Sequence, residues 1–517
     1  MKSSKSTYIK NIIFPCLVYS GITGILTGGL IFIFKLAVSR VVPISEAAYD
    51  FVREKPAFLP VLLLAAATLG CASAFILRIA PDCKGGGIPT SITLLKGLLS
   101  FNWVKSIVLL MPSALITYLG GVPLGTEGPS VQMGTAVGRG TVRIFAKKHP
   151  AWDRYIMTAG ASAGFAAATG APLTGILFPF EEAHRRFSPM LFMTSAISAV
   201  TSTAVIRVLC PMAGLSPVLF HAPELSTLPV SLMAVPAITG LLCGLCGAGF
   251  ADIYNKIHRL ESKITRLPLA VKAALLFVAT AISGFFFKEC IGSGDLLIEQ
   301  LIEGELTWKL LLVYFCIRAI ILITANNIGI TGGLFVPTLC FGAIIGGMCG
   351  KLMTVSGLMD EKYYTRTVVT GICAFLAASS HTPLMAVAFS FEALGAVNNA
   401  IPVCLGVAIA NITVEALRAY DFTDIVIESK LRKANSGKTS EVMDIQQTVN
   451  ADSFASGKEI RDILWPPKCT VLSVHKKPST HHHSHTGLEA GDILDIHLET
   501  TDKNESLARL CDILGKQ

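Results

Sequence analysis

Glu127 lies in the sequence Gly-Thr-Glu-Gly-Pro at residues 125–129, at the start of a long apolar segment. An ionised carboxylate inside a bilayer costs roughly 2.5 to 3.5 kcal/mol, so it marks a functional site unless a partner neutralises it. Glycines leave the neighbouring backbone amides open to a ligand, and amides at a helix N-terminus bind anions. The pattern therefore predicts an anion site, with Glu127 as an anion tethered beside it.

Two further stretches combine glycine and proline in a similar way. They are Gly-Gly-Gly-Ile-Pro at residues 85–89 and Gly-Gly-Leu-Phe-Val-Pro at residues 332–337. Proline suits the first turn of a helix, and the helix dipole adds partial positive charge there. Amide sites of this kind suit conduction, which requires that a small anion bind only moderately. We expect three broken helices to point their N-termini at one ligand near the middle of the membrane.

Glu127 and two acids further along the chain, Glu181 and Glu182, could carry protons. When ionised, Glu127 would occupy the place of a permeating anion, and when protonated it would swing away, so one residue is gate and proton acceptor. Glu182, at the cytoplasmic end of its helix, could pass protons toward Glu127. The alternative for Glu127 is a structural acid bonded to backbone amides. The alternative for Glu181 and Glu182 is a solvated helix end paired with Arg185 and Arg186.

The composition indicates a polytopic membrane protein. Of 517 residues, 52% are hydrophobic and only 15% are charged, and the mean hydropathy of +0.60 excludes a soluble enzyme of this length. The net charge of +8 favours contact of cytoplasmic loops with anionic lipid rather than nucleic acid. The basic N-terminus predicts a cytoplasmic start and a retained first span. The predicted spans are residues 12–36, 59–79, 104–119, 190–209, 228–250, 269–287 and 310–325.

Two parts of the membrane region resemble each other, which indicates a duplicated half. Residues 164–181 match residues 375–392, with Glu181 on Glu392, and residues 125–134 match residues 333–342 at nearly the same offset. Positive charges follow the first copy at residues 184–186, whereas residues 393–400 after the second copy carry none. Since positive loops stay cytoplasmic, the halves, about residues 10–208 and 228–430, have opposite orientations. The sequence thus predicts an all-α, inverted-repeat membrane fold with broken helices meeting at the midplane.

These motifs resemble those of the CLC family of chloride channels and proton/chloride antiporters. Residues 85–89 resemble the family's GSGIP, residues 125–129 its GREGP and residues 333–337 its GxFxP, in the family's order. Residues 161–182 resemble the segment that carries the family's inner proton glutamate. The resemblance extends over about residues 10–430.

The resemblance implies a homodimer in the cell membrane, with one anion pathway in each subunit and both termini in the cytoplasm. By position, Glu127 would be the gate, Glu182 the inner proton acceptor and Glu181 its neighbour on the water side. Because channels of the family commonly lack the inner glutamate, we expect proton-coupled chloride antiport. The alternatives are a passive chloride channel and an exchanger for another anion. Chloride is the transported ion, and no cofactor or metal is expected. The residues expected to bind the anion are Gly86, Gly87, Ile88, Gly128, Leu334, Phe335 and Tyr420.

Three departures from the family pattern concern the anion site. Gly86 replaces a serine whose hydroxyl helps to coordinate the anion, which leaves the identity of the anion open. Tyr420 is the candidate for the coordinating tyrosine, although another alignment of the last helix places Thr423 there. Thr126 replaces an arginine beside the gate.

A remote alternative, an intramembrane hydrolase, rests on the Gly-x-Ser-x-Gly pattern at residues 160–164, which we interpret as helix packing.

The chain after residue 431 is soluble in character. Residues 432–450 are polar and predict a linker, and residues 451–517 predict a small cytoplasmic α+β unit. Strands are expected at residues 469–475 and 492–498, followed by a helix at residues 505–514. Residues 457–464 and 488–494 resemble the TrkA-C domain, which implies a regulatory module that binds a small ligand or makes a dimer contact. The histidines at residues 481–485 predict a polar loop, with metal chelation as the alternative.

Overall fold

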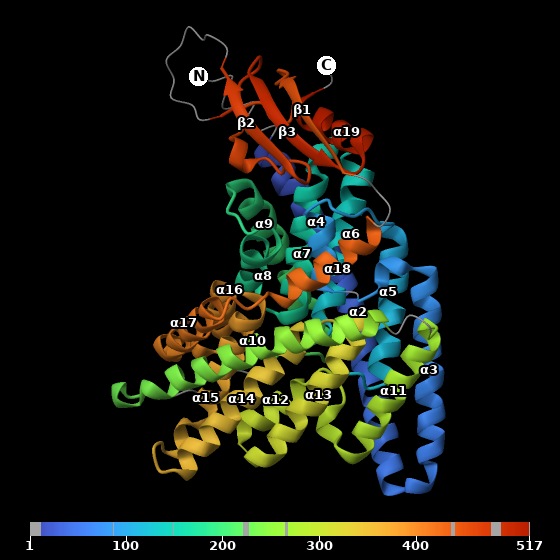
Figure 1. Cartoon of the computed structure of the whole chain (residues 1–517), viewed down its shortest axis with the longest axis vertical. Helices are drawn as coiled ribbons and strands as arrows, with labels where there is room; N and C mark the ends of the chain where they lie inside the picture. The colour runs from blue at the N-terminus through green and yellow to red at the C-terminus, as the bar shows by residue number, and fades with distance from the viewer. Residues whose placement is uncertain are drawn as a thin grey trace.

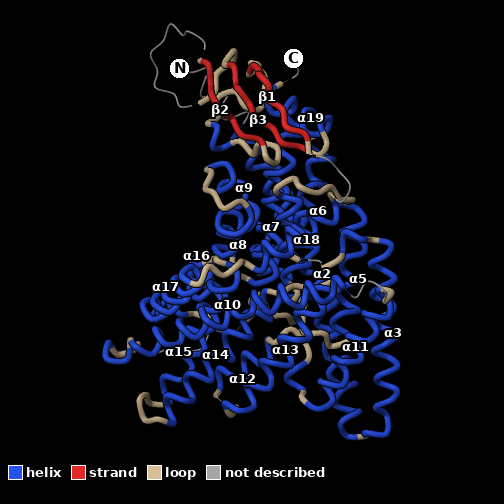
Figure 2. The backbone as a smooth tube through the Cα atoms, in the orientation of Figure 1, coloured by secondary structure: helices blue, strands red, loops and turns tan. Residues whose placement is uncertain are grey.

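Long apolar helices make up the chain as far as residue 434, and three strands follow toward its C-terminal end. The computed structural model describes residues 12–85, 87–147, 149–220, 227–263, 267–304, 306–435, 440–476 and 487–515. The strands lie together at one end of the helical part (Figure 1; Figure 2). We call this the proximal end, and the opposite end of the helical part the distal end.

All seven predicted membrane spans are helical, and two further apolar helices accompany them. The nine are α2 Phe14–Glu54, α3 Leu59–Ile79, α5 Trp103–Leu119, α9 Pro189–Met212, α10 Ala234–Lys263, α11 Leu269–Phe286, α13 Trp308–Ile328, α14 Phe335–Val355 and α17 Ala400–Ala416. Within the described residues, eight helices are long and apolar enough to cross a membrane. The predicted spans did not include α14 and α17, because glycine and proline interrupt both apolar runs.

Four helices rich in small residues form the interior of the bundle. They are α6 Glu127–Phe145, α7 Asp153–Thr169, α14 and α15 Tyr364–Ser380, and most of their residues are buried. A Cβ added at Gly134 in α6 would lie 2.0 Å from the carbonyl oxygen of Gly160 in α7. A Cβ at Gly342 in α14 would lie 2.4 Å from the carbonyl oxygen of Gly371 in α15. The matching halves of the sequence thus use the same close helix packing.

Shorter helices connect these long ones. They are α4 Ile88–Leu95, α8 Pro172–Phe178, α12 Asp295–Glu303, α16 Pro383–Ala393 and α18 Phe422–Ala434. Proline lies at the start of α4, α8 and α16, where a helix needs no N–H from it. A π-helical turn, Pro179–Ala183, follows α8 and carries Glu181 and Glu182; such turns often occur at functional sites.

The two halves hold each other by reciprocal contacts. Gly125 and Gly333 exchange two backbone hydrogen bonds of 2.7 Å in an antiparallel bridge. The Glu181 carboxylate accepts bonds of 2.8 and 2.6 Å from two backbone amides in the first turn of α16. The Glu392 carboxylate accepts bonds of 2.6 and 2.8 Å from two amides in the first turn of α8. Paired contacts of this kind confirm the predicted inverted repeat.

The C-terminal unit is a three-stranded antiparallel sheet with one helix. Its strand order is β1 Glu441–Thr448, β3 Ile493–Thr500 and β2 Cys469–His475, and α19 Lys503–Leu514 follows β3. The predicted strands and helix are confirmed, but the predicted linker is too long. Residues 441–448 pair with β3, and their polar composition reflects a strand with one exposed face. The histidines at residues 481–485 lie outside the described residues.

Candidate functional site

Three broken helices begin side by side in the interior of the bundle. Gly87 precedes α4, Glu127 begins α6 and Phe335 begins α14. A Cβ added at Gly128 would lie 2.7 Å from the Cα atom of Gly333 and 2.8 Å from the Cα atom of Gly87, so only glycine fits there. The predicted convergence of the three N-termini is therefore present in the structure, and their free amides favour a negative charge.

A small central pocket lies at these helix starts. Its volume is about 20 Å³, enough for one water molecule or a small ion. Four of the residues expected at the anion site, Gly87, Ile88, Leu334 and Phe335, line this pocket together with Glu182. The remaining lining residues are Gly85, Pro89, Asn326, Gly332, Thr338, Leu376, Ser380 and Phe422. The pocket thus brings together residues from both halves of the repeat.

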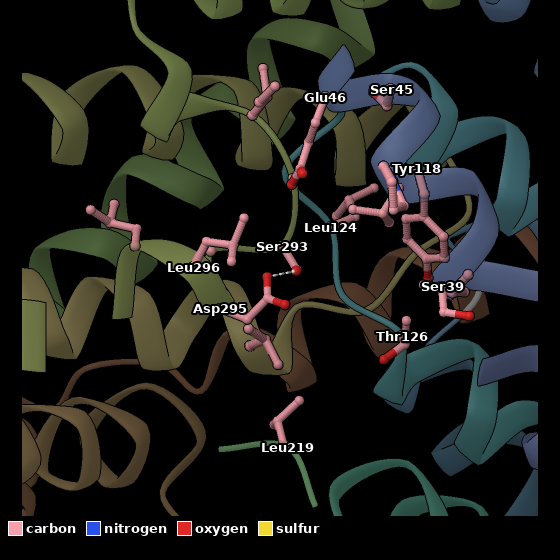
Figure 3. Close-up of a pocket in the computed structure, with 18 of the residues that line it drawn as sticks. Ser39, Ser45, Glu46, Tyr118, Leu124, Thr126, Leu219, Ser293, Asp295 and Leu296 are labelled. Carbon is pink, nitrogen blue, oxygen red and sulfur yellow. Dashed lines mark hydrogen bonds between the residues drawn. The ribbon is translucent and has the colours of Figure 1, made fainter. Parts of the chain in front are cut away.

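Two larger cavities lie on either side of these helix starts, one toward each end of the helical part. The proximal cavity has a volume of about 480 Å³ and shares Gly85 and Asn326 with the central pocket. The distal cavity, about 440 Å³, is lined by Glu127 and by Val336, the residue after Phe335. Glu127 therefore lies where the distal cavity meets the helix starts of the central pocket. Figure 3 shows the distal cavity, with Thr126 across it from Asp295.

Glu127 is fully buried, yet its carboxylate is only partly bonded. The hydroxyl of Thr126 donates a hydrogen bond of 2.9 Å to Oε1. Among the described residues, Oε2 has no hydrogen-bond partner. A structural carboxylate normally has partners on both oxygens. The geometry thus favours a side chain that can move over the alternative of a fixed structural acid.

Glu182 is 4% exposed and reaches the central pocket from the π-helical turn. Its Oε1 lies 3.5 Å from the hydroxyl of Thr423, at the limit of a hydrogen bond. Arg185 bonds instead to Asp421 at 2.6 Å and to Asp424 at 2.9 Å. The structure therefore does not show the alternative, a helix end in which Arg185 pairs with Glu182.

Glu181 points away from the central pocket toward α16. Its two oxygens accept the amide hydrogen bonds from the first turn of that helix, so the side chain acts as a helix cap. Sequence analysis could not find this partner, because the two segments lie about 200 residues apart in the chain. A part for Glu181 in proton transfer stays a prediction.

The structure argues against Tyr420 as an anion ligand. Its side chain is 68% exposed and does not line the central pocket, whereas Phe422 does. Thr423, the alternative position, is buried beside Glu182. The chain enters α18 at Phe422, which turns Tyr420 outward. Gly86 lies outside the described residues.

Basic residues of the proximal cavity were not found from the sequence. Lys84, Lys430 and Lys433 line it, and the Lys430 ammonium donates to the carbonyl oxygen of Lys84 at 3.0 Å and to the hydroxyl of Thr90. The signal that could have found them is the spacing in α18, which places lysines at positions 430 and 433 on one helix face. These lysines give the proximal cavity a positive potential that attracts anions.

The hydrolase alternative has no support in the structure. Ser162 lies within α7 rather than at a strand-to-helix turn, and its hydroxyl has no hydrogen-bond partner among the described residues. Gly160 and Gly164 pack against the backbone of α6, as expected for close helix packing.

A bundle of apolar helices, built from an inverted repeat with broken helices meeting inside it, defines a membrane transport protein. The chain belongs to the voltage gated chloride channel family, whose model matches residues 65–415.

Known relatives agree with this assignment. The H(+)/Cl(-) exchange transporter ClcA of Vibrio cholerae serotype O1 is 31% identical over an alignment of 399 residues that covers 73% of this chain and 82% of that protein. ClcA of Salmonella arizonae is 28% identical over an alignment of 390 residues that covers 73% of this chain and 80% of that protein. Among solved structures, a slow cyanobacterial Cl-/H+ antiporter matches with a TM-score of 0.75 and 25% identity, over 81% of this chain and 99% of that chain.

Proposed function

We propose that the protein exchanges chloride for protons across the cell membrane. The observation that carries the proposal is the position of Glu127, a buried acid with one unbonded oxygen, between the distal cavity and the helix starts of the central pocket. The exchange activity of the ClcA relatives supports the same conclusion. One carboxylate at this place would serve both ions, because it competes with the anion when ionised and withdraws when protonated.

The anion would rest in the central pocket against the helix starts of α4 and α14. Gly87, Ile88, Leu334 and Phe335 line the pocket at these two N-termini, where partial positive charge gathers. Gly128 packs against Gly87 and keeps the start of α6 close to them. Since the described part of the pocket holds no lysine or arginine, binding would be moderate, as rapid release requires.

Protons would take a separate course on the proximal side. Glu182 lines the central pocket but is absent from the lining of the proximal cavity, where Lys84 and Lys430 would draw anions. A proton that binds the Glu182 carboxylate could pass, through water, to the carboxylate of Glu127. Protonated Glu127 would then move away and let the anion occupy its place. Loss of the proton to the distal side would bring the ionised side chain back.

The remaining parts of the proposal concern orientation and assembly. The proximal end, with the start of α2 and the C-terminal sheet, would face the cytoplasm, consistent with Arg185, Arg186, Lys430 and Lys433 near that end. The resemblance to the family supports a homodimer embedded in lipid. The C-terminal sheet would act as a TrkA-C-like regulatory unit that binds a small ligand or its copy in the dimer.

Flux measurements on purified protein in liposomes test the exchange. A chloride gradient imposed without a proton gradient should drive protons against their own gradient, measured with a pH-sensitive dye in the vesicles. A proton ionophore should collapse that pH change, and empty vesicles serve as the control. Chloride movement with no accompanying proton movement would reject exchange in favour of the passive channel.

An exchanger for another anion is the second candidate, because Gly86 lacks the hydroxyl that the family motif places at the anion. The same vesicles, loaded with nitrate, bromide or fluoride instead of chloride, distinguish the two. Chloride should drive protons at least as fast as the other three ions. A clear preference for one of the others would assign that ion as the substrate.

A further inference from the structure

The distal cavity carries an excess of acidic side chains. Its lining includes four carboxylates, Glu46, Glu127, Glu289 and Asp295, and two lysines. Figure 3 shows Glu46 and Asp295 facing the same space. An anion that enters here meets a negative potential, which lowers its local concentration. A pathway for anions therefore needs a positive charge at this place to offset it.

Most charged groups of the cavity already have partners. The ammonium of Lys288 bonds to Asp50 at 2.8 Å. The hydroxyl of Tyr314 donates to Glu289 at 2.8 Å. Asp295 accepts a hydrogen bond of 2.5 Å from Ser293 (Figure 3). Lys288 is thus paired with an acid outside the cavity, an acid that also bonds to Arg53 at 2.7 Å.

Lys35 is different. It projects from the apolar helix α2 into the cavity, half-buried, and has no ion pair or hydrogen bond within the described ranges. Lys35 and Glu127 line the same cavity, so their opposite charges act on the same space. A lysine in the middle of a membrane helix is costly and therefore points to a function.

We propose that Lys35 is the anion-capture residue of the distal cavity: its ammonium draws chloride to the gate, where chloride and the Glu127 carboxylate compete for it; this inference rests on the proposed exchange function. Thr126, which bonds to the gate carboxylate, stands where the family motif has an arginine, so the positive charge near the gate comes from α2 instead. The flexible stem of lysine lets the ammonium follow either the carboxylate or the anion. An arriving anion would weaken the attraction between Lys35 and Glu127 and help the gate to leave.

Three variants test the charge. Lys35→Met keeps the length of the side chain but removes the charge, Lys35→Arg keeps the charge, and Lys35→Met with Thr126→Arg returns a charge from α6. The measurement is the initial rate of chloride uptake into liposomes as a function of chloride concentration at constant ionic strength. Lys35→Met should raise the half-saturating chloride concentration about tenfold, equivalent to roughly 1.4 kcal/mol. Lys35→Arg should stay within about threefold of the unmodified protein, and the double variant, which also removes the Thr126 hydroxyl from Glu127, should be half-saturated at a lower chloride concentration than Lys35→Met.

Particular results would overturn the inference. An unchanged half-saturating concentration for Lys35→Met, in protein that elutes as a single peak and still transports, rejects Lys35 as the capture residue. If neither Lys35→Arg nor the double variant has a lower half-saturating chloride concentration than Lys35→Met, Lys35 acts through packing rather than charge. That result rejects the inference as well. Unmodified protein without saturable chloride uptake rejects the exchange function itself, so the two failures are distinguishable.

Discussion

Glu127 combines two properties that rarely occur in one buried carboxylate. It is fully buried at the edge of the distal cavity, and one of its oxygens has no hydrogen-bond partner among the described residues. An unbonded buried carboxylate loses the hydration that an ion normally has, so the side chain gains from protonation or from movement. Thr126 is the side chain that bonds it, through a hydroxyl that serves either state of the acid.

Replacement of this acid by its amide should uncouple the two ions. In Glu127→Gln the side chain keeps its size but neither gains nor loses a proton at ordinary pH. Chloride-driven proton uptake should fall to the level of empty vesicles, and chloride flux should lose its dependence on pH. Glu46→Gln, a carboxylate change in the same distal cavity, is the matched control. It should retain both chloride-driven proton uptake and the pH dependence of chloride flux. Proton uptake by Glu127→Gln at half the normal rate or more would exclude the shared-gate mechanism.

Glu182→Gln should have a narrower effect. Glu182 lines the central pocket but not the proximal cavity. A glutamine side chain at this position should therefore block the proton pathway and leave the anion pathway open. We expect chloride flux within about threefold of normal and no measurable proton uptake. Glu428→Gln, an exposed acid on the neighbouring helix α18, provides the control. Retention of proton uptake in Glu182→Gln would place the inner acceptor elsewhere.

Single residues differ in how well the sequence predicts them. Glu127 and Glu182 stand out because an acid in an apolar segment has few structural explanations. The choice between Tyr420 and Thr423 depended on where α18 begins, and a shift of one or two residues at a turn changes which side chain faces inward. Lys35 was not singled out, because its importance depends on acids that come from distant helices.

At the scale of elements, the two halves are joined by helix caps that cross between them. Glu181 caps α16 and Glu392 caps α8, and a hydroxyl of α8, that of Thr174, also donates to Glu392 at 2.9 Å. A carboxylate at a helix N-terminus gains from both the amide bonds and the dipole. Since α8 leads into the π-helical turn with Glu182, these caps also hold the inner acid in place.

Removal of one cap should cost stability. Glu392→Gln keeps the size but loses the charge and one acceptor oxygen, so an amide of α8 is left without its bond. We expect the free energy of unfolding to fall by about 1 to 3 kcal/mol, measured by thermal unfolding in detergent. Glu415→Gln, at a 66% exposed acid, should change it by less than about 0.5 kcal/mol. Equal effects of the two substitutions would show that the cap contributes no more than a surface charge.

The repeat was visible in the sequence because proline, glycine and glutamate recur at fixed spacing, and each has a positional reason in the structure. Proline begins the broken helices, glycine marks close contacts and glutamate caps the partner helix. The strand β1 was mistaken for linker because its pairing with β3 is a long-range contact that local composition does not report.

At the scale of the whole molecule, the C-terminal unit is fixed to the helical part near the site. The Tyr155 hydroxyl accepts a hydrogen bond of 2.8 Å from the amide of Leu464. Arg154 bonds to the carbonyl oxygen of Leu464 at 3.0 Å and to that of Leu95, the last residue of α4, at 2.8 Å. Because the start of α4 lines the central pocket, a shift of the C-terminal unit would reach the anion site through one short helix.

Tyr155→Phe should loosen this attachment. The substitution leaves the amide of Leu464 buried without its acceptor, which costs about 1 to 3 kcal/mol. Hydrogen exchange at that amide should accelerate by about tenfold or more. The exchange takes place in the full-length protein and is measured by mass spectrometry on the peptide that contains Leu464. Tyr19→Phe, a tyrosine packed on Trp152 beside the same contact, should leave the exchange rate unchanged. Unchanged exchange in Tyr155→Phe would mean that the hydroxyl does not hold the unit.

The central claim, that the protein exchanges chloride for protons, is tested most directly by the voltage at which transport stops. Liposomes with a fixed chloride gradient are held at known voltages with potassium and valinomycin, and only the pH gradient is varied. For an exchanger, the voltage of zero chloride flux should shift with the pH gradient and lie between the equilibrium potentials of the two ions. A zero-flux voltage that stays at the chloride equilibrium potential at every pH gradient would contradict the account.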